Sequence, residues 1–268
     1  MKKTILNILT AVFALVFLAS GFLLVRYYVN SSKQEKIYSH LSQIMEKEEG
    51  ATLPGNVSAQ PKPEYTAVTD PEGNTVMILP QFEELYKLNP DVVGWMRIEG
   101  TALDYPVMYK PDSEEFYLRR NYYGEKATHG CLYIQETCSV FPRTDNLTIY
   151  GHNMRDGSMF GCLKNYRKES FWKEHPVITF NTLKEEAQYE IFAVFATTSS
   201  VGKGFKYHFF INAAGEGEFR DFVDTCKELS FYDTGIDPVP GDQFITLSTC
   251  EDTLINGRLV VVARRVTE

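Results

Sequence analysis

Two strand-forming runs near the C-terminal end constrain the fold of this chain most strongly. Residues 244–250 read FITLSTC and residues 258–265 read RLVVVARR, so both runs are rich in β-branched and apolar residues. Only the seven residues 251–257 separate them, which predicts two neighbouring strands joined by a short polar loop. Because side chains alternate along a strand, Thr246, Ser248 and Cys250 are expected on one face.

This arrangement predicts a reactive cysteine. Cys250 would stand at the end of its strand, close to Arg258 at the start of the next one. A thiolate beside a guanidinium is a potential nucleophile, and the guanidinium can also stabilise an oxyanion. A site of this kind still requires a base, which must come from elsewhere in the chain.

Upstream of the pair, short strand-like runs alternate with Gly, Pro, Asn and Asp residues. These runs lie at 93–98, 105–109, 131–134, 147–150, 177–180 and 189–197. A short helix is expected at 82–88, ended by Asn89 and Pro90, and helical insertions are expected at 159–166 and 218–229. Many short strands with few helices predict a mainly β fold in the form of a closed or nearly closed barrel.

The N-terminal residues predict a membrane anchor. Residues 5–25 are apolar except for Asn7, Thr10 and Ser20, and a helix of this length can cross a bilayer. Two lysines precede the run, so the positive-inside rule places residues 1–4 in the cytoplasm and the rest outside. A cleavable signal peptide with a processing site at 19–21 is the alternative, although the run is longer than a usual signal-peptide core. We therefore expect a single-pass cell-membrane protein with an extracellular catalytic domain.

Residues 26–75 are expected to connect the anchor to the folded domain. Ile37, Leu41, Ile44 and Met45 have helical spacing within a polar segment. Residues 46–74 are rich in Gly, Pro, Ser and charged residues without a period, which is typical of a flexible linker. The catalytic domain is then expected over residues 76–268.

Charge and cysteine usage exclude several classes of function. The net charge of −8 argues against a nucleic-acid-binding protein. The sequence contains neither a CxxC pair nor His and Cys residues at metal-ligand spacing, so we expect no metal and no cofactor. Five cysteines leave at least one thiol free. Cys131 and Cys138 either form a disulfide in an oxidising exterior or are buried as small apolar side chains.

His152 is the candidate for the missing base. It follows the apolar run 147–150 and Gly151, so it lies at a strand end, as Cys250 does. A hydrogen-bonded structural histidine is the alternative reading. The other four histidines lie in polar segments or turns, where a catalytic role is not indicated.

These segments resemble the catalytic His, Cys and Arg segments of the sortase family, namely YGHNM at 150–154, TLSTC at 246–250 and Arg258. Further stretches resemble class B sortases in particular: VGWMRI at 93–98, DYPV at 104–107, FYL at 116–118 and DGSMF at 156–160. The helical insertion before the cysteine strand also resembles class B. The resemblance covers residues 76–266 and implies a sortase-like closed β-barrel.

The resemblance implies a cysteine transpeptidase. Cys250 would attack the threonine carbonyl of a C-terminal sorting signal, with His152 as general acid and base and Arg258 as oxyanion donor. The implied partners are secreted surface proteins with NPxTN- or LPxTG-like signals and a peptidoglycan amine. Two alternatives are a Cys–His peptidase that only hydrolyses peptides and an anchored binding module without activity.

Several neighbouring residues are expected to support the site. Four are predicted to contact the substrate: Leu118, Ser248, Tyr207 and Glu251. The alternatives are that Leu118 packs in the core, that Ser248 is an ordinary serine on a strand face and that Glu251 lies in a solvated loop. Asp252 is predicted to orient His152 or Arg258 from the second shell of the site.

Overall fold

The computed structural model describes residues 2–51, 64–113 and 115–266. Its centre is a closed eight-stranded barrel in the order β10-β8-β7-β3-β4-β5-β6-β9. The strands are β3 (Val92–Arg97), β4 (Asp104–Met108), β5 (Leu132–Ile134), β6 (Asn146–Tyr150), β7 (Val177–Thr182), β8 (Gln188–Thr198), β9 (Phe244–Glu251) and β10 (Gly257–Arg265). The predicted barrel and its eight strand positions are confirmed.

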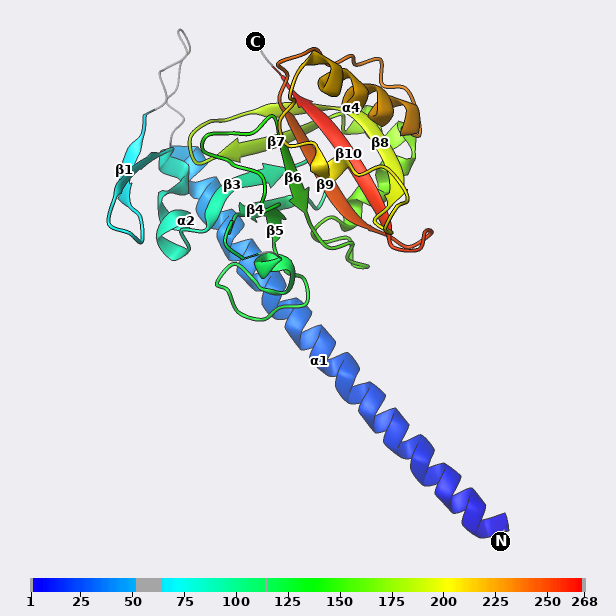
Figure 1. Ribbon diagram of the computed structural model, residues 1–268. Helices are drawn as coiled ribbons and strands as arrows, with labels where there is room; N and C mark the ends of the chain where they lie inside the picture. Colours follow the sequence, from blue (N-terminus) through cyan, green and yellow to red (C-terminus); the bar gives the residue numbers. More distant parts are fainter. Residues whose placement is uncertain (1, 52–63, 114, 267–268) are drawn as a thin grey trace.

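Strands β8, β9 and β10 are buried on both faces because α4 (Glu216–Leu229) covers their outer side (Figure 1). Inward-facing side chains such as Ile245 and Leu247 belong to the main core inside the barrel. Outward-facing side chains such as Phe244 and Val260 form a second apolar cluster with α4. The helix buries Phe219, Phe222, Val223 and Cys226 in this cluster. Burial on both faces explains why these strands read as nearly continuous apolar runs.

The helix α1 (Lys2–Ala51) is continuous over 50 residues. Its N-terminal half stands away from the barrel, and its C-terminal half lies against it (Figure 1). The buried side chains of this half recur at helical spacing: Gln34, Tyr38, Leu41 and Met45. Among the described residues, α1 is the one helix long and apolar enough to cross a membrane.

The segment predicted as an aperiodic linker contains regular structure. Residues 46–51 belong to α1, and β1 (Thr66–Thr69) pairs with β2 (Thr75–Ile78) in an antiparallel hairpin. Residues 52–63 of the predicted linker lie outside the described residues. The strand β1 was not recognised because four residues with one buried side chain, Val68, carry too little periodicity. The Tyr65 hydroxyl ties the hairpin to the barrel by donating to the Lys184 carbonyl at 2.9 Å.

The remaining elements are short helices between the strands. They are η1 (Pro80–Phe82), α2 (Glu83–Leu88), η2 (Phe116–Arg119), η3 (Gly161–Arg167), α3 (Glu169–Glu174) and η4 (Tyr207–Phe209). The insertion predicted at 159–166 is thus a 3-10 helix, and α3 was not predicted. Cys131 and Cys138 are buried and free, so the disulfide alternative is wrong and the apolar one is confirmed.

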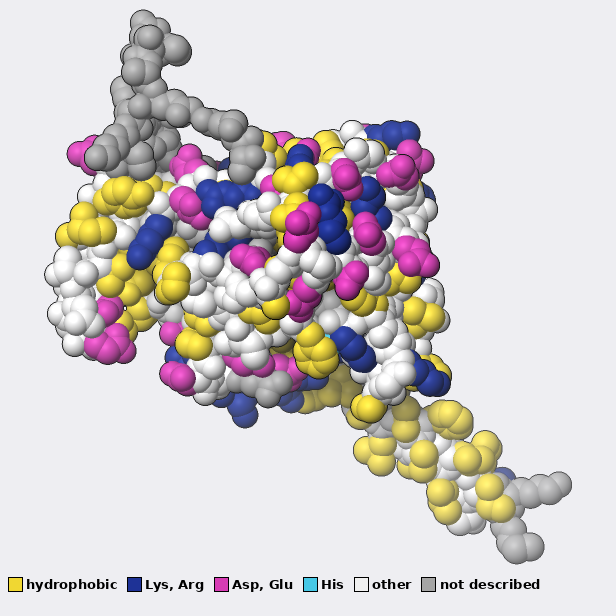
Figure 2. Space-filling view, turned by 45° about the horizontal axis from the view of Figure 1, so that its top comes forward, with side chains coloured by type: hydrophobic (Ala, Val, Ile, Leu, Met, Phe, Trp, Pro, Cys, Tyr) yellow, Lys and Arg dark blue, Asp and Glu magenta, His cyan; other side chains and the backbone are white. Residues whose placement is uncertain are grey.

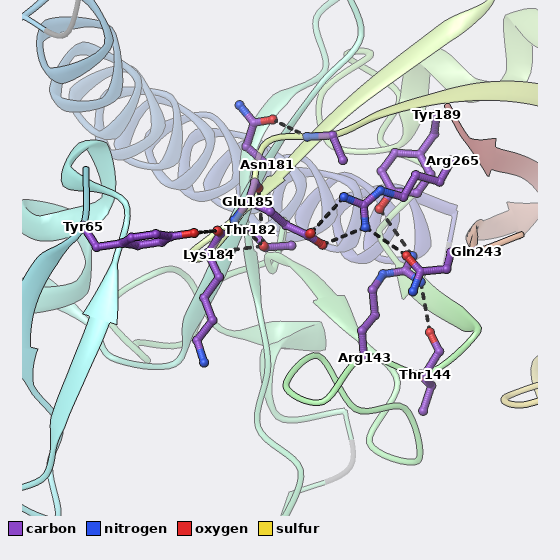
Figure 3. Close-up of polar contacts among 11 residues, drawn as sticks. Tyr65, Arg143, Thr144, Asn181, Thr182, Lys184, Glu185, Tyr189, Gln243 and Arg265 are labelled. Carbon is purple, nitrogen blue, oxygen red and sulfur yellow. Dashed lines mark hydrogen bonds and ion pairs between the residues drawn. The ribbon is translucent and has the colours of Figure 1, made fainter. Parts of the chain in front are cut away.

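A polar network closes the end of the barrel at which β9 begins and β10 ends (Figure 3). The Arg265 guanidinium donates to both carboxylate oxygens of Glu185, at 3.0 and 2.8 Å, and to Gln243 Oε1 at 2.9 Å. Arg143 donates to the Phe244 carbonyl at 2.9 Å. These bonds join the β7–β8 turn to the ends of β9 and β10.

Replacing Arg265 with Gln should lower stability modestly and leave activity unchanged. The side chains of Arg265 and Glu185 are 22% and 38% exposed, so solvent screens their attraction. We expect the free energy of unfolding to fall by about 1 kcal/mol and the melting temperature by about 2–4 °C. Thermal denaturation measures this change. A large loss of activity would contradict the placement of this network away from the site.

Candidate active site

Strand register places Cys250 beside Arg258. The two residues are direct partners across the antiparallel pair β9–β10, and Thr197 on β8 is the partner of Arg258 on its other side. Directly opposite residues of neighbouring strands share a face of the sheet. These three side chains therefore project from the outer face of the barrel wall, beside the cluster covered by α4.

His152 reaches the same place from β6. This strand runs parallel to β9 with Tyr150 opposite Ser248, so His152 follows at the level of Cys250. Three hydrogen bonds hold the two chain segments together. Thr249 Oγ1 donates to the Gly151 carbonyl at 2.7 Å, the Gly151 amide donates to the Ser248 carbonyl at 3.3 Å, and Asn153 Nδ2 donates to the Cys250 carbonyl at 3.1 Å.

Cys250 is the exposed thiol of the chain. The other four cysteines, Cys131, Cys138, Cys162 and Cys226, are buried. Burial raises the pKa of Cys131 to about 12 and that of Cys162 to about 11, which disfavours their thiolates. Nucleophilic chemistry by a thiol is therefore available at Cys250.

The imidazole of His152 is oriented by a backbone carbonyl. Its Nε2 lies 2.7 Å from the Leu118 oxygen in η2, and because a carbonyl only accepts, Nε2 carries the proton. Nδ1 is then the nitrogen free to exchange a proton with the thiol or the substrate. Burial lowers the pKa of His152, the bond to Leu118 opposes this, and the electrostatic effects of Arg119 and His129 lower it further.

We expect the pKa of His152 to lie below its usual value of about 6.5 and to rise towards it in Arg119→Gln, because this change removes a like charge. The lowered pKa favours the neutral form of the His152 ring. NMR titration of the labelled ring measures both values. Arg120→Gln is the control, because its guanidinium instead donates to the Gly124 carbonyl and lies over the Phe116 ring. An unchanged pKa in Arg119→Gln would contradict this account.

An aromatic wall borders Cys250. Tyr133 and Tyr150 are partners on β5 and β6, with ring centroids 5.5 Å apart. Burial raises the pKa of Tyr133, and both Arg258 and Cys250 are near enough to influence it. These rings form one side of the surface next to the thiol.

Tyr207 and Ser248 lie next to each other and are buried beside the site. The Tyr207 hydroxyl lies 2.6 Å from Ser248 Oγ, and the two residues are only 4% and 1% exposed. Each hydroxyl thus holds the other in place, and the predicted contacts of both residues with the substrate stay predictions. Tyr207 stays close to the site, since both Arg258 and Cys250 influence its pKa, which burial raises.

Glu251 and Asp252 do not lie where the sequence placed them. Glu251 continues β9 and is 9% exposed on the face opposite Cys250, where its carboxylate pairs with Arg167 at 2.7 Å. The predicted contact of Glu251 with the substrate stays a prediction, since its carboxylate is held in this ion pair. Asp252 is exposed, and its side chain has no hydrogen-bond partner among the described residues. The group that contacts the His152 ring is the Leu118 carbonyl.

Leu118 serves the site through its backbone. Its partly buried side chain packs against the core, whereas its carbonyl holds His152. The sequence also gave no role to Asn153, although it stands within the YGHNM segment and supports the backbone of Cys250. Among the described residues, no group of three or more His, Cys, Asp or Glu side chains could hold a metal ion.

Comparison with known proteins agrees with this geometry. Residues 96–266 match the Sortase domain family. The chain is 34% identical to Sortase B of Listeria monocytogenes over 190 residues, and 30% identical to Sortase B of Staphylococcus aureus over 189 residues. Each alignment covers 70% of this chain and 75% of the relative.

Solved structures show the same likeness. A Staphylococcus aureus sortase B–substrate complex superposes with a TM-score of 0.74 at 25% identity, covering 89% of this chain and 99% of that one. A sortase B from Bacillus anthracis gives a TM-score of 0.70 at 29% identity, covering 90% of this chain and all, 100%, of that one.

Proposed function

Because this chain belongs to the sortase family, as a class B member with cysteine transpeptidase activity, we propose that Cys250 is its nucleophile, His152 its acid–base group and Arg258 its oxyanion donor. One observation carries these assignments. The exposed thiol lies directly opposite Arg258 and level with His152, at one edge of the barrel wall.

The first half-reaction forms a thioester. Cys250 passes its thiol proton to His152 Nδ1 while its Sγ attacks the threonine carbonyl carbon of the sorting signal, and the carbonyl oxygen takes the negative charge. Arg258 stabilises this oxyanion with a fixed, charged donor. Collapse of the intermediate breaks the peptide C–N bond, and His152 gives a proton to the departing amine.

The second half-reaction reverses these roles. An amine of peptidoglycan attacks the thioester carbonyl while His152 removes a proton from the attacking nitrogen. The C–S bond then breaks, Cys250 is released, and the substrate protein is joined to the acceptor through a new amide bond. The bond between His152 and the Leu118 carbonyl keeps the same ring nitrogen directed at the reaction throughout.

We infer that the exposed apolar half of α1 anchors the enzyme in the cell membrane, with its N-terminus in the cytoplasm and the barrel outside. Side chains along this half, such as Phe17 and Leu24, are 78% and 69% exposed, which suits a lipid environment and not water. The two lysines that precede the apolar run support this orientation.

We propose that the substrate carries an NPxTN- or LPxTG-like signal, and a peptide assay tests this. The full chain in lipid nanodiscs would be incubated with Asn-Pro-x-Thr and Leu-Pro-x-Thr peptides, with and without a glycine-type amine. Mass spectrometry should find an amine-joined product for one peptide. Hydrolysed product alone in the presence of amine would contradict transfer to an amine under these conditions.

A further inference from the structure

A cleft lies between α1 and the loops that follow β4, on the side of the barrel from which the helix leaves. Its volume is about 1240 Å³. Apolar side chains of α1 line one wall: Phe22, Leu23, Val25, Tyr27 and Val29. Residues of η2 and of the following loop, from Phe116 to Thr128, line the other wall.

The cleft is cationic, although the chain as a whole has a net charge of −8. Five positive side chains line it: Arg26, Lys33, Arg119, Arg120 and Lys126. A single carboxylate, Glu115, belongs to the described lining. Figure 2 shows Lys and Arg side chains gathered along the edge of the barrel where the helix emerges.

Three of these cations are available to a ligand. Lys33 pairs with Glu125 at 2.9 Å, and Arg120 lies over the Phe116 ring at 4.6 Å. Arg26, Arg119 and Lys126 are exposed, and within the described part of the chain none of their side chains has a hydrogen-bond or ion-pair partner. Unpaired cations beside an apolar wall match a ligand that combines an anionic group with hydrocarbon.

The position of the cleft along α1 indicates the source of that ligand. The apolar residues 5–25 span about 31 Å as a helix, close to the hydrocarbon thickness of a bilayer of about 30 Å. Arg26 is then the first charged side chain outside the hydrocarbon. The barrel meets the helix just beyond this level, where Asn30 Nδ2 donates to Thr128 Oγ1 at 3.0 Å. The cleft therefore lies at the height of the lipid headgroups.

We propose that this cleft binds an anionic phospholipid of the outer leaflet, with its phosphate between Arg119 and Lys126 and its acyl chains along Phe22 and Val25. The proposal rests on the membrane anchoring inferred above. Arg119 directly follows Leu118, whose carbonyl orients His152. A lipid bound here would fix the orientation of the barrel on the membrane through the same short helix that supports the base.

The test measures the lipid preference of the full chain in nanodiscs that contain phosphatidylcholine and phosphatidylglycerol. Electron paramagnetic resonance of spin-labelled lipids gives the association constant of phosphatidylglycerol relative to phosphatidylcholine. In the double variant Arg119→Gln/Lys126→Gln this ratio should fall about 25-fold, because each of the two removed charges contributes about fivefold. The two N-terminal lysines attract phosphatidylglycerol equally in every variant, so their contribution cancels when the ratios are compared.

The matched control is Lys164→Gln/Lys168→Gln, which removes the same charge from exposed positions outside the cleft and should leave the ratio unchanged. Equal ratios in wild type and both variants would overturn the proposal. Loss of the preference in millimolar glycerol phosphate would also overturn it, because the site would then take a soluble phosphate. Protease protection of α1 is measured in parallel. A chain that does not insert leaves α1 open to the protease, which identifies a failure of the anchoring and not of the lipid site.

Discussion

The variant Cys250→Ala should lose transpeptidation almost completely, with kcat/KM falling by on the order of 10⁴-fold or more. In the proposed mechanism the sulfur forms the thioester, and no other exposed thiol is present to replace it, since the remaining four cysteines are buried. The amine-transfer assay with mass-spectrometric detection measures this loss. The thioacyl adduct formed with substrate peptide should disappear in the same variant.

Cys226→Ala provides the matched control. This thiol lies on the buried face of α4, so its removal should reduce stability by about 1 kcal/mol while leaving amine transfer intact. Alkylation of the folded protein should give a single adduct, on Cys250. Residual transfer by Cys250→Ala close to the wild-type rate would eliminate this residue as the nucleophile.

The variant Arg258→Gln should lower kcat/KM by about 10²- to 10³-fold, as expected for loss of one oxyanion donor. The guanidinium is half-buried, and its backbone lies directly opposite Cys250. Arg258→Lys keeps the charge but loses the planar pair of donors, so we expect it to recover only part of the activity. Stopped-flow acylation with a quenched peptide gives kcat and KM separately.

The separate effects of the substitution on kcat and on KM identify the role of Arg258. A fall in kcat with unchanged KM indicates oxyanion stabilisation, whereas a rise in KM with unchanged kcat indicates that the residue positions the peptide. Arg265→Gln is the control, since it makes the same substitution on the same strand at the opposite end of the barrel. Wild-type kinetics in Arg258→Gln would exclude both roles.

The barrel was predictable because its strands are mostly buried apolar runs separated by clear turn residues, and even the short strand β5 is buried throughout. The hairpin strand β1 and the helix α3 were not, since β1 has one buried side chain and α3 has none. The extension of α1 through residues 46–51 was not predicted, because charged residues are as common at a helix end as in a linker.

For the site, sequence reasoning identified the candidate residues but not the groups that hold them in place. Glu251 was misplaced because β9 was expected to end at Cys250, whereas it extends one residue further and turns that carboxylate to the opposite face. The partner of His152 is a backbone oxygen, which every residue type has, so the sequence cannot indicate which residue supplies it. The burial of Ser248 under Tyr207 depends on how η4 folds back, which no local pattern records.

The unbroken course of α1 has a kinetic consequence. Since one helix runs from the apolar segment into the contacts with the barrel, the barrel should share the slow rotational diffusion of its anchor instead of tumbling independently. With the apolar half of α1 in the membrane, as proposed, the barrel would then be held at a constant height and orientation above it. Breaking the helix with a glycine pair at residues 29–30 would restore free tumbling, which fluorescence anisotropy of a labelled barrel would detect.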